Sequence, residues 1–377
     1  MTREVVVTGI GLVSNAGEGV EAHLQALAAG APPRTDAERF APHPVHPLAA
    51  LDYDKQIPKK SDQRQMEAWQ RIGVYAAGLA LDAAGVKDDA ELKARMHLVV
   101  AAGGGERDYA VDGQILTGLR QAENPGVFLN ERLMGDLRPT LFLAQLSNLL
   151  AGNISIVHGV TGASRTFMGE ESSGVDAIRI AQARIASGQN DIFLVGGAYN
   201  AERPDVLLIY EMGGFLWKQP YRPVRERGPE GGMILGSGAC FLVLESREHA
   251  EARGAKPLAA IAGVASDRAR REPGSVTKAL TKLAGDLDAK PDLVISGATG
   301  VAEMTGEEMA AIAALAPQAA VRMTGDLIGH TMEGQAPAGV GLAAALIADG
   351  QASEALVTSV GHQRGEGAVR LVRASGA

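Results

Sequence analysis

Short strand-forming runs that end at glycine alternate along this chain with longer stretches of helical periodicity. Strands are predicted where β-branched and apolar residues precede a glycine turn, at 5–8, 97–102, 164–168 and 192–195. Between them, apolar residues recur every three to four positions, which is the spacing of an amphipathic helix. The helices predicted on this basis span 67–84, 139–151 and 174–186. Residues 31–63 are rich in Pro, His and charge, so we expect a surface excursion with His43 and His46 in solvent.

A repeat within the chain indicates that the fold contains two related units. Residues 183–195 (ARIASGQNDIFLV) and 345–357 (ALIADGQASEALV) are identical at seven of 13 positions. In both copies a helix end is followed by a glycine, which terminates helices well, and then by an apolar strand. A further apolar strand follows each copy, at 240–244 and 368–372. We therefore predict a duplicated α/β unit whose buried parallel strands are covered by helices on both faces.

Composition and charge exclude several classes of partner. The 377 residues carry a net charge of −8 with no dense basic run, which argues against nucleic acid or an anionic membrane surface. No apolar stretch reaches the roughly 18 uncharged residues of a membrane helix, so no membrane insertion is expected. Cys240 is the one cysteine, and the first residues lack the zones of a secretory signal, so we predict a cytoplasmic protein. Ser14 stands where GxGxxG requires its third glycine, and no cofactor is predicted.

Three longer segments carry motifs of a known family. They are residues 4–17 (EVVVTGIGLVSNAG), 143–166 (LAQLSNLLAGNISIVHGVTGASRT) and 222–255 (RPVRERGPEGGMILGSGACFLVLESREHAEARGA). These segments resemble the β-ketoacyl-acyl-carrier-protein synthases, which have the thiolase fold. The resemblance implies an α/β protein with duplicated halves in an α-β-α-β-α arrangement. The two β-ketoacyl-synthase-like halves are expected at residues 1–250 and 251–377.

The resemblance also implies which positions should carry catalysis. In such enzymes a cysteine at the N-terminus of a buried helix takes the acyl chain as a thioester, because the helix dipole favours its thiolate. Two histidines stabilise the enolate that forms when malonyl carrier protein loses carbon dioxide, and a lysine supports the second histidine. Aligning the motifs Cys-x-x-Gly, HGTGT and KSMTGH with this chain assigns these positions, in the order cysteine, first histidine, lysine and second histidine, to Glu171, Gly297, Val321 and Asp326.

Each replacement removes a different chemical step. A carboxylate at position 171 forms only a mixed anhydride with an acyl group, which hydrolyses far more readily than a thioester, and it is a weaker nucleophile than a thiolate. Gly297 offers no hydrogen-bond donor, and an ionised Asp326 would repel the charge of the enolate. The alignment therefore predicts a degenerate site with neither acyl transfer nor decarboxylation.

Glu171 itself has two interpretations. An acidic residue in the first turn stabilises a helix by about 0.3–1 kcal/mol, which is a purely structural role. The other interpretation is a new site, because the family geometry would bring Glu171 together with Asp326 and the C-terminal loop that carries His362. His330, four residues after Asp326, is the other candidate to pair with Glu171. His362 lies in VGHQRG (360–365), where the family has an aromatic FGFGG loop, and we predict that it pairs with Glu171 and fills the old acyl pocket. These residues lack a recognised metal-ligand spacing such as HExxH, so no metal is predicted.

One branch of the family keeps the scaffold without the chemistry: the chain-length factors, which pair with an active synthase and shape its acyl tunnel. The chain resembles them, although their cysteine position is typically Gln. We predict a non-catalytic subunit of fatty acid or polyketide synthesis that forms a heterodimer with an active ketosynthase, or a homodimer, through the surface near 164–190, and that meets acyl carrier protein. The alternative is an enzyme with remodelled, hydrolytic chemistry that uses Glu171, Asp326 and a histidine. Cys240, within the apolar run CFLVL, is predicted to be a core residue.

Overall fold

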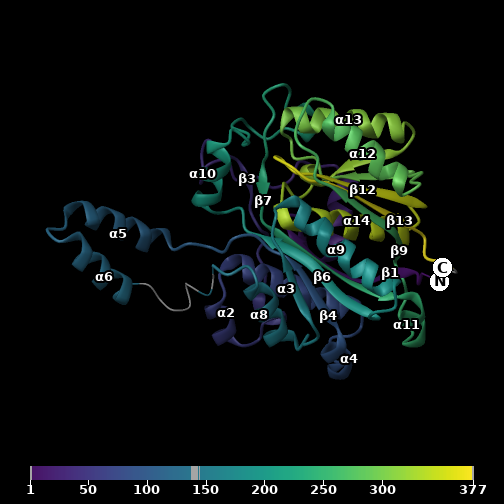
Figure 1. The fold of residues 1–377 in the computed structure, drawn as a ribbon, viewed down its shortest axis with the longest axis horizontal. Helices are drawn as coiled ribbons and strands as arrows, with labels where there is room; N and C mark the ends of the chain where they lie inside the picture. Colours follow the sequence, from purple (N-terminus) through teal and green to yellow (C-terminus); the bar gives the residue numbers. More distant parts are fainter. Residues whose placement is uncertain (1, 137–142, 144, 376–377) are drawn as a thin grey trace.

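The fold is built around a sheet in which one arrangement of five strands occurs twice (Figure 1). The computed structural model describes residues 2–136, 143 and 145–375. The first set has the order β5-β4-β6-β8-β1 and the second the order β11-β10-β12-β13-β9. In each set the first three strands are parallel, and the last two are antiparallel to their neighbours. A short antiparallel pairing of β1 with β9 joins the two sets.

The two sets divide cleanly along the chain. The strands of the first set are β1 (Val5–Ser14), β4 (His97–Ala101), β5 (Ser164–Phe167), β6 (Ile192–Tyr199) and β8 (Gly238–Ser246). Those of the second are β9 (Ala259–Asp267), β10 (Leu293–Ser296), β11 (Ala320–Met323), β12 (Glu354–Val360) and β13 (Glu366–Val372). The predicted repeat corresponds to α9–β6 and α14–β12. The predicted boundary between residues 250 and 251 falls within α11 (Arg247–Ala252), which lies between β8 and β9 in the chain.

The prediction of parallel strands is correct for only part of each set. The strands that follow the repeat, β8 and β13, run antiparallel to β6 and β12. Between β12 and β13 the chain has only residues 361–365, whereas a parallel pair needs a crossover of about a dozen residues or more. This short connection enforces a hairpin, and it places His362 at the end of the sheet.

Helices complete five layers around the two sets of strands. α9 (Glu171–Ala186) and α14 (Gln335–Ala348) lie between the sets (Figure 1). The outer layers are α3 (Ala68–Ala83) with α8 (Leu149–His158), and α12 (Ser275–Asp286) with α13 (Ala302–Leu315). Every residue of α14 from Gln335 to Ile347 is buried, and most are Ala or Gly. Such small side chains let a helix pack closely against strands on both sides. The predicted layered, thiolase-like α/β fold is confirmed.

The predicted elements differ from the structure in detail. The helix predicted at 174–186 begins three residues earlier, at Glu171. Of the helix predicted at 139–151, residues 139–142 and 144 lie outside the described residues, and α8 begins only at Leu149. His46 was expected in solvent but is fully buried, because β3 (Val45–His46) pairs with β7 (Leu235–Gly236). The segment 31–63 therefore enters the fold instead of only covering it.

The remaining elements lie around this core. They are β2 (Gly17–Glu18), α1 (Gly19–Ala29), α2 (Lys60–Gln65), α4 (Ala90–Arg95), α5 (Tyr109–Gln121), α6 (Pro125–Gly135), α10 (Pro204–Met212) and α11 (Arg247–Ala252), with the 3-10 turns η1 (Tyr53–Lys55), η2 (Val224–Glu226), η3 (Thr324–Asp326) and η4 (Met332–Gly334). α5 and α6 project away from the body (Figure 1). Within the described part of the chain, no helix combines the length and the apolar character needed to cross a bilayer.

Candidate functional site

A sharp turn between β5 and α9 presents two adjacent carboxylates. β5 ends at Phe167, and α9 begins at Glu171. Between them Gly169 has φ 139° and Glu170 has φ 54°, in the region that non-glycine residues rarely adopt. A residue held in such a conformation costs about 1–3 kcal/mol, and such residues cluster at functional sites. The turn directs Glu171 into the protein, where it is 1% exposed, and leaves Glu170 partly exposed.

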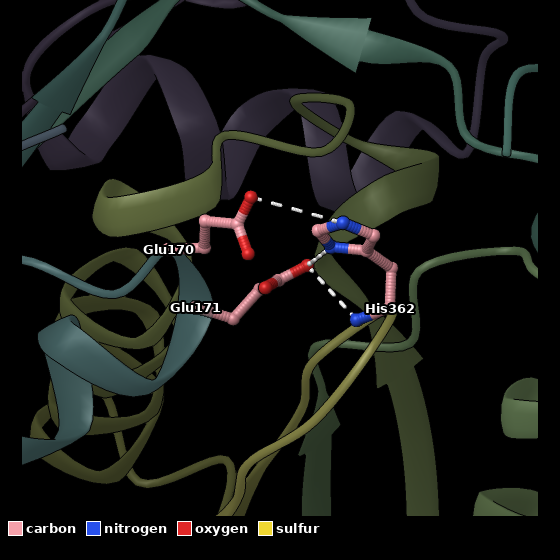
Figure 2. A group of neighbouring side chains, drawn as sticks. All are labelled: Glu170, Glu171 and His362. Atoms are coloured by element: carbon pink, nitrogen blue, oxygen red, sulfur yellow. Dashed lines mark hydrogen bonds and ion pairs between the residues drawn. The ribbon is translucent and has the colours of Figure 1, made fainter. Parts of the chain in front are cut away.

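Two histidines converge on one oxygen of Glu171. Oε1 of Glu171 lies 2.9 Å from Nε2 of His330 and 2.9 Å from Nδ1 of His362, and it also accepts the backbone N–H of His362 at 3.2 Å. An ionised carboxylate only accepts hydrogen bonds, so both ring nitrogens must donate. Figure 2 shows Glu171 and His362 facing each other from α9 and from the β12–β13 loop. The predicted pairing of Glu171 with His362 is confirmed.

The electrostatics of the cluster follow from these contacts. Burial alone raises the pKa of Glu171, but the hydrogen bonds and positive charge of His330 and His362 outweigh it and hold that pKa well below its usual value. Burial lowers the pKa of His362, yet its hydrogen bond to Glu171 and the charges of Glu171 and Glu170 leave that pKa raised. The arrangement favours an ionised Glu171 in contact with a protonated His362. A carboxylate stabilised in this way is a weak nucleophile.

Aromatic groups and Glu170 enclose the outer side of His362. The ring centroids of Tyr210 and Phe215 lie 5.2 and 4.9 Å from that of His362, both edge to face. Oε1 of Glu170 lies 3.8 Å from Nε2 of His362 and accepts the hydroxyl of Tyr210 at 3.2 Å. The imidazole is therefore held between one carboxylate on each ring nitrogen and two aromatic rings.

Asp326 does not join this cluster, which corrects the prediction. Its Oδ1 accepts the backbone N–H of Val224 at 2.7 Å, and it lies among Tyr221, Arg225 and Arg227. The Gly–His pair that reaches Glu171 is Gly329–His330, four residues further on. A histidine therefore does lie beside position 171, where the alignment on MTG had assigned an aspartate. The alternative function, a hydrolytic enzyme that uses Glu171, Asp326 and a histidine, therefore lacks Asp326 at this site.

The other two assigned positions also lie outside the Glu171 contacts. Gly297 follows β10, and a Cβ there would meet the carbonyl oxygen of Thr358 at 2.8 Å and Cγ of Gln335 at 3.4 Å. The Gln335 side chain thus occupies the space beside Gly297, held by hydrogen bonds to Thr324 and Thr331. Val321 lies in β11 and borders a different surface cavity.

A cavity of about 460 Å³ adjoins the cluster. Its wall includes Glu170, Tyr210 and Ile209, together with Glu333 of η4. Glu333 is buried, and its Oε2 has no hydrogen-bond partner among the described residues. Burial raises the pKa of Glu333 to about 8, with the nearby negative charges of Glu171 and Glu170 adding to the effect. The sequence analysis missed Glu170 and Glu333. Two features of the sequence could have identified them. Glu170 is half of a Glu–Glu doublet, and Glu333 is an acidic residue inside an apolar run, where a charge is costly to bury.

The single thiol takes no part in the cluster. Cys240 lies in β8, fully buried, and its Sγ contacts the carbonyl oxygen of Pro337 at 3.2 Å. Burial raises the pKa of the thiol, so the thiolate needed for acyl transfer is disfavoured. Cys240 is a core residue, as predicted.

Comparison with known proteins identifies the family. A family model described as "Beta-ketoacyl synthase, N-terminal domain" matches residues 2–250. The chain belongs to the β-ketoacyl synthase family. Its sequence is 30% identical over 270 residues, 69% of this chain, to 3-oxoacyl-[acyl-carrier-protein] synthase 2 of Vibrio cholerae, and the match covers 62% of that relative. The match to this relative thus spans less than two thirds of its length.

Two further relatives extend the comparison of this β-ketoacyl synthase homologue. It is 28% identical over 353 residues to the tetracenomycin polyketide synthase ketoacyl synthase beta subunit of Streptomyces glaucescens, covering 89% of this chain and 82% of that one. The ishigamide ketosynthase/chain length factor structure matches with a TM-score of 0.81 at 22% identity, covering all of both chains. This structural match supports the thiolase-like fold alone.

Proposed function

We propose that this chain is a non-catalytic, chain-length-factor-like subunit that pairs with an active ketosynthase in the cytoplasm. The observation that carries the proposal is the occupant of the first turn of α9: Glu171, buried and held by His330 and His362, stands where the family resemblance places the nucleophilic cysteine. With the one thiol buried in β8, no group in the described site forms a thioester. The similarity to a ketoacyl synthase beta subunit over 89% of this chain supports the same function.

The surface of the protein supports pairing with a second subunit. β5 is the last strand of its set, and in the described residues only its β4 side is paired. Met168, directly after β5, and Leu208, Ile209 and Met212 of α10 are all more than half exposed. Met168 and Ile209 also line the cavity beside Glu170. An apolar patch next to an open sheet edge is typical of a protein interface. We call these four residues the α10 patch.

The proposal names an active, cysteine-containing ketosynthase as the partner, with acyl carrier protein as the donor of the chain on which the pair acts. In such a pair the partner supplies the thiol and both histidines. This chain would then contribute the shape of the shared acyl cavity. A homodimer through the same surface is the competing arrangement.

Co-expression tests the proposal directly. The chain is produced with an affinity tag alongside the cysteine-containing ketosynthase encoded nearest to its own gene, and the purified material is analysed by light scattering during size-exclusion chromatography. We expect a stable 1:1 complex that condenses acyl and malonyl groups on carrier protein. The complex should keep its activity when Glu171→Gln is introduced and lose it when the partner's cysteine is replaced.

Two results would contradict the proposal. One is a homodimer that excludes the ketosynthase under all conditions. The other is turnover by the isolated chain, detected by mass spectrometry of the carrier-protein-bound acyl group, that disappears with Glu171→Gln.

A further inference from the structure

Few side chains attach α10 to the body of the protein. Of its nine residues, Leu207 and Tyr210 are the buried ones, while Leu208, Ile209 and Met212 are more than half exposed. Isolated helices shorter than about 12–15 residues are only marginally stable in water, so the order of α10 depends on its tertiary contacts. The contacts of Tyr210 therefore influence where the α10 patch lies.

Tyr210 is anchored at the turn that precedes α9. Its hydroxyl donates to Oε1 of Glu170 at 3.2 Å. Its ring meets the ring of His362 edge to face, with 5.2 Å between the two centroids. The same oxygen of Glu170 lies 3.8 Å from Nε2 of His362. Glu170, Tyr210 and His362 thus contact one another on the inner side of α10.

The charge of His362 decides whether its contact with Glu170 is attractive. Nδ1–H of His362 donates to Oε1 of Glu171, so Nε2, which faces Glu170, is the nitrogen that gains or loses a proton (Figure 2). When Nε2 is protonated, the imidazolium attracts the carboxylate of Glu170. When Nε2 is deprotonated, its lone pair faces a carboxylate oxygen, and the two acceptors repel each other. Nε2 has no hydrogen-bond partner among the described residues that would compensate for this change.

The surroundings of His362 determine the pH at which this change takes place. Burial lowers the pKa of His362, but the hydrogen bond to Glu171 and the charges of Glu171 and Glu170 raise it above the ordinary value of 6.5, and Arg271 opposes them only in part. The proton on Nε2 is therefore held at pH 6 and lost as the pH rises above 6.5. The titratable and charged groups around the ring are Glu170, Glu171, Tyr210 and Arg271, with His330 on the far side of Glu171.

We propose that His362 is a pH-sensitive positioning residue, which in its protonated form holds Glu170 and Tyr210, and with them α10, in the position that a partner subunit binds. When the proton leaves, Glu170 separates from the imidazole, the hydrogen bond from Tyr210 is no longer fixed, and α10 loosens. The effect on the partner rests on the proposed function, in which the α10 patch is part of the interface. The effect on α10 itself does not.

Two other titratable groups need controls. Nε2 of His43 lies 3.6 Å from Oε2 of Glu211, at the C-terminal end of α10. Glu333 lines the cavity beside Glu170, and its pKa of about 8 means that it also loses its proton between pH 6 and pH 9. The remaining charged or hydroxyl groups with polar contacts at α10 are Tyr109, Arg203, Asp205 and Lys218.

Hydrogen–deuterium exchange on the isolated full chain tests the proposal. Exchange of the α10 amides is followed by mass spectrometry at pH 6, 7, 8 and 9, and each rate is divided into the intrinsic rate at that pH to give a protection factor. In the unaltered chain we expect the protection of α10 to fall at least threefold from pH 6 to pH 9.

Four variants assign the change to its source. His362→Gln has a neutral side chain that takes no proton, and Glu170→Gln removes the negative charge while keeping an acceptor for Tyr210. In both variants the protection of α10 should already be low at pH 6 and should fall distinctly less than in the unaltered chain. His43→Gln and Glu333→Gln are the matched controls, and both should keep the fall. Circular dichroism and melting temperature establish folding, and Glu170→Gln, a partly exposed site, keeps the test valid if His362→Gln does not fold.

The pH dependence of pairing forms the second arm. The affinity for the ketosynthase should fall at least threefold from pH 6 to pH 9 with the unaltered chain, and distinctly less with His362→Gln. If no complex forms at any pH, the proposed function fails, and the exchange experiment still decides whether His362 controls α10. Protection of α10 that does not change with pH, or that falls equally in His362→Gln, would overturn the proposal.

Discussion

At the scale of single residues, two buried glutamates close to the same cavity have opposite pKa shifts. Glu171 receives two imidazole donors, and its pKa lies below the ordinary value. Glu333 is buried near two other carboxylates, and both effects raise its pKa, to about 8. Burial acts on both in the same direction, since it disfavours the charged form. The difference therefore comes from the hydrogen bonds that His330 and His362 give to Glu171 alone.

The raised pKa of Glu333 predicts that the free energy of unfolding falls as the pH rises from about 5 to about 8. The folded protein holds the Glu333 proton, with a pKa of about 8, in a range where the unfolded chain, with the ordinary value of 4.5, has lost it. Unfolding then releases a proton, so the free energy of unfolding falls with increasing pH, by up to about 1.4 kcal/mol for each unit between the two pKa values. Urea denaturation at pH 5, 6, 7 and 8 measures this slope.

The isosteric variant Glu333→Gln provides the control for this prediction. It cannot ionise, so its stability should change distinctly less between pH 5 and pH 8 than that of the unaltered chain. The titration of His362, whose pKa is raised, adds to the pH dependence of stability in both proteins, so it cancels when the two slopes are compared. Equal pH slopes in the two proteins would show that Glu333 does not titrate in this range.

At the scale of elements, the position of Glu171 depends on how closely α9 approaches the start of α14. Gly174, one turn after Glu171, faces η4 and the first turn of α14. A Cβ at Gly174 would lie 2.7 Å from the carbonyl oxygen of Glu333 and 2.8 Å from Cδ of Pro337. Both neighbours are parts of the backbone or of a rigid ring, so they have little freedom to move. The glycine lets the helix that carries Glu171 meet the segment that carries His330.

Gly174→Ala should therefore destabilise the protein by about 1–3 kcal/mol, which is the usual cost of forcing an extra methyl group into a packed core. Gly306→Ala, in α13, is the matched control, because a Cβ at Gly306 meets nothing within 4 Å. Replacing a helical glycine by alanine without a clash should stabilise the protein by about 0.5–1 kcal/mol. Thermal and urea unfolding measure both effects. A stabilising Gly174→Ala would show that α9 and α14 are not packed as described.

At the scale of the whole molecule, the sheet ends at β5 beside the α10 patch. The opposite end of the sheet, at β11, adjoins α13 and a surface cavity instead. We therefore expect the proposed partner to bind the face where the sheet edge, Met168 and α10 lie together. Large apolar side chains that stay exposed in the isolated chain gain stability when a partner covers them, at about 25 cal/mol for each Å² removed from water.

Ile209→Lys and Met212→Lys should each weaken the complex with the ketosynthase at least tenfold, because a charge would be buried at the interface. The melting temperature of the isolated chain should change little, since both side chains are more than half exposed there. Ala314→Lys, on the exposed surface of α13 at the opposite end of the sheet, is the control and should leave the affinity unchanged. Affinities come from surface-based binding kinetics. Unaltered binding by both α10 variants would place the interface elsewhere.

Much of the architecture was predictable from local patterns. The copies at 183–195 and 345–357 revealed the duplication because a helix end, a glycine and an apolar strand leave the same signal in each half. The loss of the thiol was visible as well, since Gly174 fixes the register of the Cys-x-x-Gly motif and so assigns the cysteine position to Glu171. The direction of β8 and β13 was not predictable from apolarity, because buried parallel and antiparallel strands have the same composition.

By itself, then, the sequence determined the family, the duplicated layers and the carboxylate at position 171, because each depends on residues that are neighbours along the chain. The tertiary structure decided which groups meet that carboxylate. His330 and His362 lie 159 and 191 residues away from Glu171. The path of the backbone after η3 decides that His330, and not Asp326 four positions before it, reaches Glu171. The burial of Glu171 and the pKa shifts of Glu171 and His362 arise from these long-range contacts, which no local pattern records.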